Sequence, residues 1–104
     1  MNVQSGEGLL PGEDLVTQGL ADLAKGVLSE SALLVLVAGP RLRGLGIQVP
    51  EWKLSEPYEH ALYSLIEERL GTGAHSYYNS LLRRIVSYAH ALEREQSQLK
   101  REQS

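Results

Sequence analysis

The most constraining feature of this sequence is a seven-residue spacing of apolar residues in its last third. Tyr78, Ile85, Leu92 and Leu99 follow one another at intervals of seven positions. Such a period is typical of a helix that packs along one stripe, because two helical turns return the side chain to nearly the same face. The spacing therefore predicts one long C-terminal helix that begins near Ala74 and extends to about Leu99.

The last eleven residues keep this period but lose most of the apolar side chains. Residues 94–97 (REQS) return unchanged as residues 101–104, seven positions later. Leu99 is the only apolar residue in this tail, and Gln96 stands where a second one would complete the pattern. A short polar helix is marginal in water by itself. Residues 94–104 are therefore predicted to be a helical extension or a frayed tail, which a second copy of the helix could hold.

Three earlier segments also carry helical patterns. Residues 12–27 and 56–70 place apolar residues at intervals of three and four, as one face of a helix requires. Residues 31–46 are apolar on all sides in their first half, which is typical of a central buried helix. No segment sustains the alternation of a strand. The predicted fold class is all-α, a single-domain four-helix bundle with a long C-terminal helix.

Local signals refine this prediction. Ser29 or Ser31 is a suitable N-cap for the second helix. Pro40 lacks the amide hydrogen that a straight helix would need. The second helix is therefore expected to be kinked or broken at Gly39-Pro40 and to continue as a short helical turn that ends at Gly44 or Gly46. Gly19 and Gly26 lie seven residues apart near the apolar face of the first helix, where they would permit a close helix crossing.

The length of 104 residues fits one domain. Residues 1–11 are polar and rich in glycine, and they are predicted to form a flexible N-terminal segment. Residues 12–93 carry the helical patterns and are predicted to form the bundle. The longest apolar run has seven residues, 32–38, which is too short to span a bilayer. A soluble, cytoplasmic protein without membrane contact is expected.

Composition excludes several kinds of chemistry. The chain has no cysteine, which rules out disulfides, iron–sulfur clusters and thiol catalysis. Its three histidines, at positions 60, 75 and 90, are fifteen residues apart, so no two of them share a helix face at metal-binding spacing. The glycine-containing turns lack the lysine and hydroxyl residue of a phosphate-binding loop. We expect no metal site and no cofactor.

One short pattern suggests a catalytic alternative. The stretch LLRRIVSYAHALE resembles the R-x(4–6)-H signature of the HEPN ribonucleases, which are helical bundles that often act as dimers. The resemblance implies metal-independent RNA cleavage by Arg83, Arg84 and His90. The chain departs from the family pattern in one respect, because neither arginine is followed by the usual uncharged polar residue.

A second alternative is a nucleic-acid-binding accessory protein. Arginine residues interleaved with aromatic ones can stack on nucleobases. The candidate residues are Arg41, Arg43, Tyr77, Arg84 and Tyr88. The formal net charge of −3 gives no general electrostatic support to this alternative, because domains that bind nucleic acid usually carry a basic excess.

The favoured prediction is a non-enzymatic interaction or regulatory module. It would act as a homodimer through the long C-terminal helix and would bind another protein of unknown identity. The predicted dimer interface follows the seven-residue spacing and its offset positions: Tyr78, Leu81, Ile85, Tyr88, Leu92 and Leu99.

Overall fold

A computed structural model describes the backbone of residues 10–103 and the side chains of residues 10–99. Nine of the eleven residues predicted to be flexible therefore lie outside the described part of the chain. The elements are α2 (Glu13–Ala24), α3 (Glu30–Val37), α4 (Gly39–Gly44), α5 (Tyr58–Leu70), the 3-10 helix η1 (Gly71–Gly73) and α6 (Ala74–Gln103). No β-strand occurs within residues 10–103, and the prediction of an all-α fold is confirmed.

Helix α2 packs on α3 at a very short distance, and Gly19 makes this possible. Gly19 is buried, and a Cβ atom built on it would lie 2.4 Å from the carbonyl oxygen of Ser31. The same atom would lie 2.5 Å from Cγ2 of Val35. Only glycine lets two helix backbones approach so closely. The predicted close crossing at Gly19 is therefore confirmed.

Helix α3 forms the centre of the core. Its five consecutive residues 32–36 are at most 3% exposed, which confirms the prediction of a buried central helix. Ser29 is the N-cap, and its Oγ accepts a hydrogen bond from the amide of Ala32 at 3.1 Å. The same hydroxyl donates to Asp22 of α2 at 2.6 Å. These two bonds fix the turn between α2 and α3.

The segment predicted to be kinked or broken at Gly39-Pro40 consists of two helices in the structure. Helix α3 ends at Val37, Ala38 forms a turn, and α4 begins at Gly39. Pro40 stands in the first turn of α4, where the missing amide hydrogen costs nothing because no residue of the same helix would accept it. The interruption therefore precedes Gly39-Pro40 by one residue.

The linker between α4 and α5 closes over the core. Trp52 and Leu54 are half-buried and pack against the buried core residues. The hydroxyl of Tyr58, the first residue of α5, donates a hydrogen bond to the carbonyl of Trp52. Gly71 ends α5 with a φ of 61°, a conformation that favours glycine.

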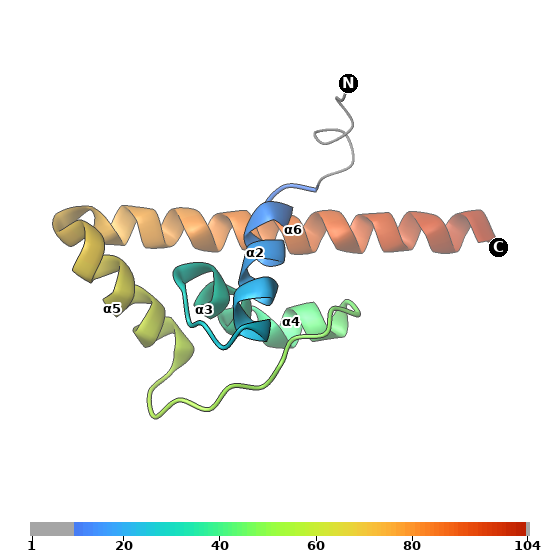
Figure 1. Ribbon diagram of the computed structural model, residues 1–104. Helices are drawn as coiled ribbons and strands as arrows, with labels where there is room; N and C mark the ends of the chain where they lie inside the picture. The colour runs from blue at the N-terminus through green and yellow to red at the C-terminus, as the bar shows by residue number, and fades with distance from the viewer. Residues whose placement is uncertain (1–9, 104) are drawn as a thin grey trace, which may run out of the picture.

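Helix α6 begins at Ala74, as predicted, and runs for 30 residues. At 1.5 Å per residue its length is about 45 Å, close to the longest dimension of the molecule, 48 Å. Figure 1 shows α6 along the whole width of the molecule, with α5 at one end and its C-terminal turns projecting at the other. The shorter helices α2, α3 and α4 lie against one side of it.

Candidate functional site

The apolar stripe of α6 faces the chain's own core for most of its length. It consists of the six predicted interface residues: Tyr78, Leu81, Ile85, Tyr88, Leu92 and Leu99. Leu81, Ile85 and Tyr88, three of the six predicted interface residues, are 2%, 3% and 6% exposed. Tyr78 and Leu92 are half-buried, and the ring of Tyr78 packs edge-on against Tyr63 of α5 at 5.4 Å. The stripe therefore serves first as the inner face of a core helix.

Leu99 is the exception, because 53% of its surface is exposed. At 100° per residue, Leu99 points within about 20° of Leu92 and about 40° of Ile85. Its side chain therefore lies on the core-facing side of α6. The stripe continues past the body of the protein, and its last apolar residue is in contact with water.

The place where α6 leaves the body is marked by two polar contacts with α4. The side-chain amide of Gln96 donates to the carbonyl of Leu45, the C-cap of α4, at 2.7 Å. One turn earlier, Glu93 accepts a hydrogen bond from Arg41 at 2.9 Å. Gln96 interrupts the apolar pattern because it satisfies a helix-end carbonyl that would otherwise lack a partner within α4.

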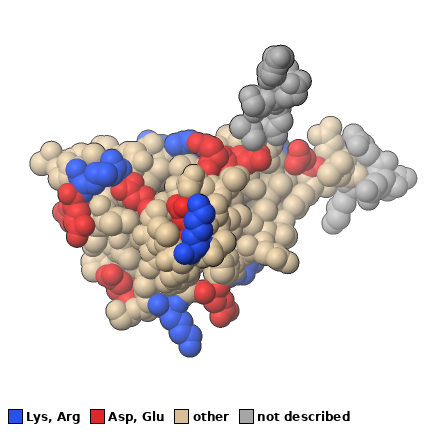
Figure 2. Space-filling model, in the orientation of Figure 1, with Lys and Arg blue, Asp and Glu red and all other residues tan. Residues whose placement is uncertain are grey.

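The residues of the nucleic-acid alternative are not assembled into one surface. Arg41 pairs with Glu93, and Arg84 pairs with both oxygens of Asp14 at 3.2 Å. Tyr88 is buried, and Tyr77 lies under the guanidinium of Arg69 at 5.0 Å. On the face drawn in Figure 2, the lysine and arginine side chains of the described residues stand in separate places.

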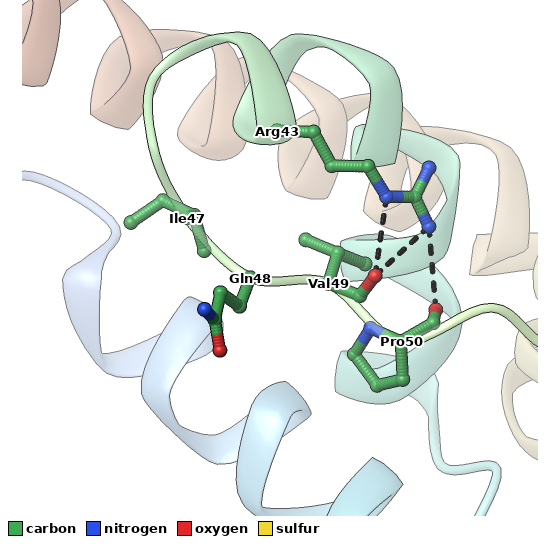
Figure 3. A pocket seen from close by; sticks show the side chains of 5 residues that line it. All are labelled: Arg43, Ile47, Gln48, Val49 and Pro50. Atoms are coloured by element: carbon green, nitrogen blue, oxygen red, sulfur yellow. Dashed lines mark hydrogen bonds between the residues drawn. The ribbon is translucent and has the colours of Figure 1, made fainter.

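Arg43, the remaining residue of that alternative, has a structural contact. Its Nε and Nη2 atoms donate to the carbonyl of Val49 at 3.1 and 3.0 Å, and Nη2 also donates to Pro50 at 3.3 Å. Figure 3 shows this guanidinium fork closing the loop that follows α4, around a hollow of about 520 Å³. Arg43 thus holds the loop against α4.

The residues of the ribonuclease alternative lie on the outer side of α6. Arg83 and His90 are both exposed, point nearly the same way and are about 10 Å apart along the helix axis. Arg83 and Arg84 line an open hollow of about 550 Å³ with Ser80, Ser87 and residues 11–12, whereas His90 does not line it. His90 thus lies apart from the hollow that the two arginines line.

Within the described residues, no cluster of three or more histidine, aspartate or glutamate side chains is arranged to hold a metal ion. Glu56 and His60 form an exposed pair at 3.0 Å, with no further ligand of this kind. None of the helices described in the structure is both long and apolar enough to cross a membrane.

Two groups on α6 have pKa values displaced by their surroundings. Burial raises the pKa of the Tyr88 hydroxyl above its usual 10.0, and the carboxylates of Glu13 and Glu95 add to the effect. Burial, with a smaller contribution from Glu59, raises the pKa of Tyr78 in the same direction. Both hydroxyls therefore keep their protons in the folded state at a pH where the unfolded chain loses them.

This difference predicts a loss of stability at alkaline pH. The pKa of Tyr88 is higher in the folded state than in the unfolded chain, where it is about 10. Below pH 10 the hydroxyl is protonated in both states, and the free energy of unfolding is unaffected. As the pH rises above 10, the unfolded chain loses this proton first, and the free energy of unfolding falls until the pH passes the pKa of the folded state. Tyr88→Phe, which cannot ionise, is expected to lose less stability than the parent between about pH 8 and about pH 11. Urea denaturation of both proteins at the two pH values measures this. An equal loss in the two proteins would contradict the assignment to Tyr88.

Comparison of the chain with protein-family models, with curated proteins and with solved structures finds no significant match.

Two features of the surface were missed by reasoning from the sequence. The contact from Gln96 to Leu45 joins residues 51 positions apart, and no local spacing signals it. The second is an apolar groove between α3, α5 and the linker, lined by residues of segments that are distant from one another in the sequence. The glutamates of α5 could be identified in the sequence, but they were interpreted only as a polar helix face, because the sequence does not indicate the groove beside them.

Proposed function

We propose that the protein is a small, non-enzymatic interaction module that forms a homodimer through the C-terminal part of α6 and binds another protein. In this proposal the body is the predicted four-helix bundle, to which α2, α3, α5 and the first part of α6 contribute. The last turns of α6 serve as an arm that pairs with a second copy. Its cytoplasmic location remains a prediction from the sequence.

The observation that carries the proposal is the exposure of Leu99 on the core-facing stripe of α6. The apolar stripe of a helix is normally covered by other residues along its whole length. On α6 the last described hydrogen bond to the rest of the chain is made by Gln96, and the stripe continues beyond it to the exposed Leu99. In a symmetric dimer the same patch serves both partners. The seven-residue return of residues 94–97 supports pairing in register with an identical helix.

The arm alone is too small to hold two chains together. Stable interfaces bury about 800 Å² on each partner, so the second copy must also cover part of the body. The neighbouring apolar surface is formed by Leu92 together with Leu45 and Ile47 beyond the end of α4, all of them half-buried. The proposed interface therefore runs from the end of α4 to Leu99.

Two substitutions at neighbouring positions test this interface. Leu99→Glu places a charge in the proposed contact, whereas Gln98→Glu adds the same charge at another exposed position of the arm. Light scattering is expected to give twice the 11.5 kDa chain mass for the parent and for Gln98→Glu, and a single chain mass for Leu99→Glu.

A truncation after Gln96 is expected to be monomeric as well, with an unchanged helical signal per residue in the body. The proposal fails if the parent is monomeric. It also fails if Leu99→Glu and the truncated chain remain dimeric, because the contact would then lie elsewhere.

The two alternatives are less well supported. Arg83 and His90 point about 160–180° away from Leu99 around α6, so the proposed dimer would not enclose them in a cleft. Arg41, Arg43 and Arg84 each already donate to acceptors within the chain, which leaves fewer donors for a phosphate backbone. Both alternatives therefore rank below the interaction module.

A further inference from the structure

An apolar groove is lined by residues of α3, α5 and the linker between α4 and α5. Figure 1 shows α5 at the end of the molecule opposite the C-terminal turns of α6. The volume of the groove is about 270 Å³. The lining residues come from the turn before α3, from α3, from the linker and from α5: Leu28, Leu33, Leu54, Glu56, Ala61, Ser64, Leu65 and Glu68.

The floor of the groove is formed by a buried core residue, and its walls are partly exposed to solvent. Leu33 is 3% exposed and belongs to the central core cluster. Leu28, Leu54 and Leu65 pack against that cluster but are only half-buried. An apolar side chain entering the groove would therefore meet a preformed surface and remove further apolar area from water.

The rim of the groove carries negative charge. Glu56, at the end of the linker, and Glu68 of α5 line it, and both side chains are exposed. The adjacent Arg69 does not neutralise Glu68, because it donates two hydrogen bonds of 2.8 Å to Glu30.

Two groups near the other end of the rim reduce its charge only in part. Glu56 contacts His60 at 3.0 Å, and Lys53 is exposed in the linker next to Leu54. The two carboxylates of the rim therefore outnumber the one lysine beside the groove.

The size of the groove limits what can occupy it. Its volume lies below the range of about 300–1,000 Å³ that is usual for small-molecule sites. Ala61 and Glu68 are seven residues apart on α5, so the α5 wall is about 10 Å long. This length matches two apolar side chains one turn apart on a partner helix. The negative rim favours a partner with lysine or arginine beside those side chains and disfavours nucleic acid and anionic lipid.

We propose that this groove binds a short amphipathic helix of another protein, with two apolar residues at i and i+4 flanked by basic residues. This inference shares with the proposed function the statement that the chain is an interaction module, and it rests on the proposed function in that respect alone. It identifies the class of partner and uses a surface separate from the dimer contact.

The test uses the full chain and a fluorescein-labelled synthetic helix of 14 residues. The peptide carries leucine at two positions one turn apart and lysine on either side, and fluorescence anisotropy measures its binding. Glu68→Gln is expected to weaken binding about fivefold at low salt. Glu67→Gln removes the same charge from the neighbouring residue of α5, which does not line the groove, and is expected to bind like the parent.

Peptide variants separate the groove from general charge attraction. A peptide with both leucines replaced by serine is expected not to bind. The proposal is overturned if the parent peptide does not bind, if the serine peptide binds equally well, or if Glu67→Gln weakens binding as much as Glu68→Gln. Light scattering on the same samples reports the dimer independently, so a failure of the peptide to bind is distinguishable from a failure of the proposed self-association.

Discussion

Gly19→Ala is expected to destabilise the protein by about 3 kcal/mol or more. The added methyl carbon would lie 2.4 Å from a carbonyl oxygen of α3 and 2.5 Å from a methyl group of Val35. The carbonyl belongs to the backbone of a helix and cannot rotate away. The clash can be relieved only if α2 moves away from α3, which opens the core along the whole contact.

Gly44→Ala is the matched control for this substitution. Gly44 is also helical, but a Cβ atom there would meet nothing within 4 Å. Alanine is the better helix former, so this variant is expected to be unchanged or more stable by about 0.5–1 kcal/mol. Urea denaturation followed through Trp52, the single tryptophan, compares the two variants. Equal stability of Gly19→Ala and Gly44→Ala would show that α2 and α3 are not in close contact at Gly19.

Ile85→Ala is the second substitution with a large expected effect. Ile85 is 3% exposed within one chain, so its truncation leaves a cavity in the core and should cost about 2–4 kcal/mol. Leu99 belongs to the same seven-residue series but is 53% exposed. Leu99→Ala should leave the stability of a single chain unchanged and should weaken only the association of two chains.

The dependence of the denaturation midpoint on protein concentration distinguishes a residue of the core from a residue of the contact between two chains. The denaturation midpoint of a dimer rises with concentration, whereas that of a monomer does not. Ile85→Ala should lower the midpoint at every concentration, and Leu99→Ala should mainly reduce the rise. A loss from Ile85→Ala that disappears at high dilution would instead assign Ile85 to the contact between chains.

Much of the fold could be predicted because it depends on local pattern. Helical spacing indicated the all-α fold, and the apolar run indicated the buried position of α3. The N-cap preference of serine limited the start of α3 to Ser29 or Ser31, and the structure has Ser29 there. Gly19 could be assigned to a close crossing because glycine near the apolar face of a helix has few other uses. Each of these inferences needs only a few neighbouring residues.

The candidate site was harder to predict, because the apolar stripe of α6 could be covered either by the chain's own core or by a second copy of the chain. A seven-residue spacing shows that a face is covered, but it does not show whether the chain's own body or a second copy covers it. Leu81, Ile85 and Tyr88 lie against the body. The contact from Arg84 to Asp14 spans 70 positions, and such distant pairs are set by how the helices pack.

The continuity of α6 across its exit from the body has a geometric consequence. Residues before and after Gln96 belong to one uninterrupted helix, so the direction in which Leu99 points is set by the orientation of the core. Inserting one residue between them would turn Leu99 by about 100° and advance it by about 1.5 Å. An insertion of seven residues would nearly restore the original direction at a greater reach. The number of residues between Gln96 and Leu99 therefore decides the direction in which the Leu99 side chain points relative to the core.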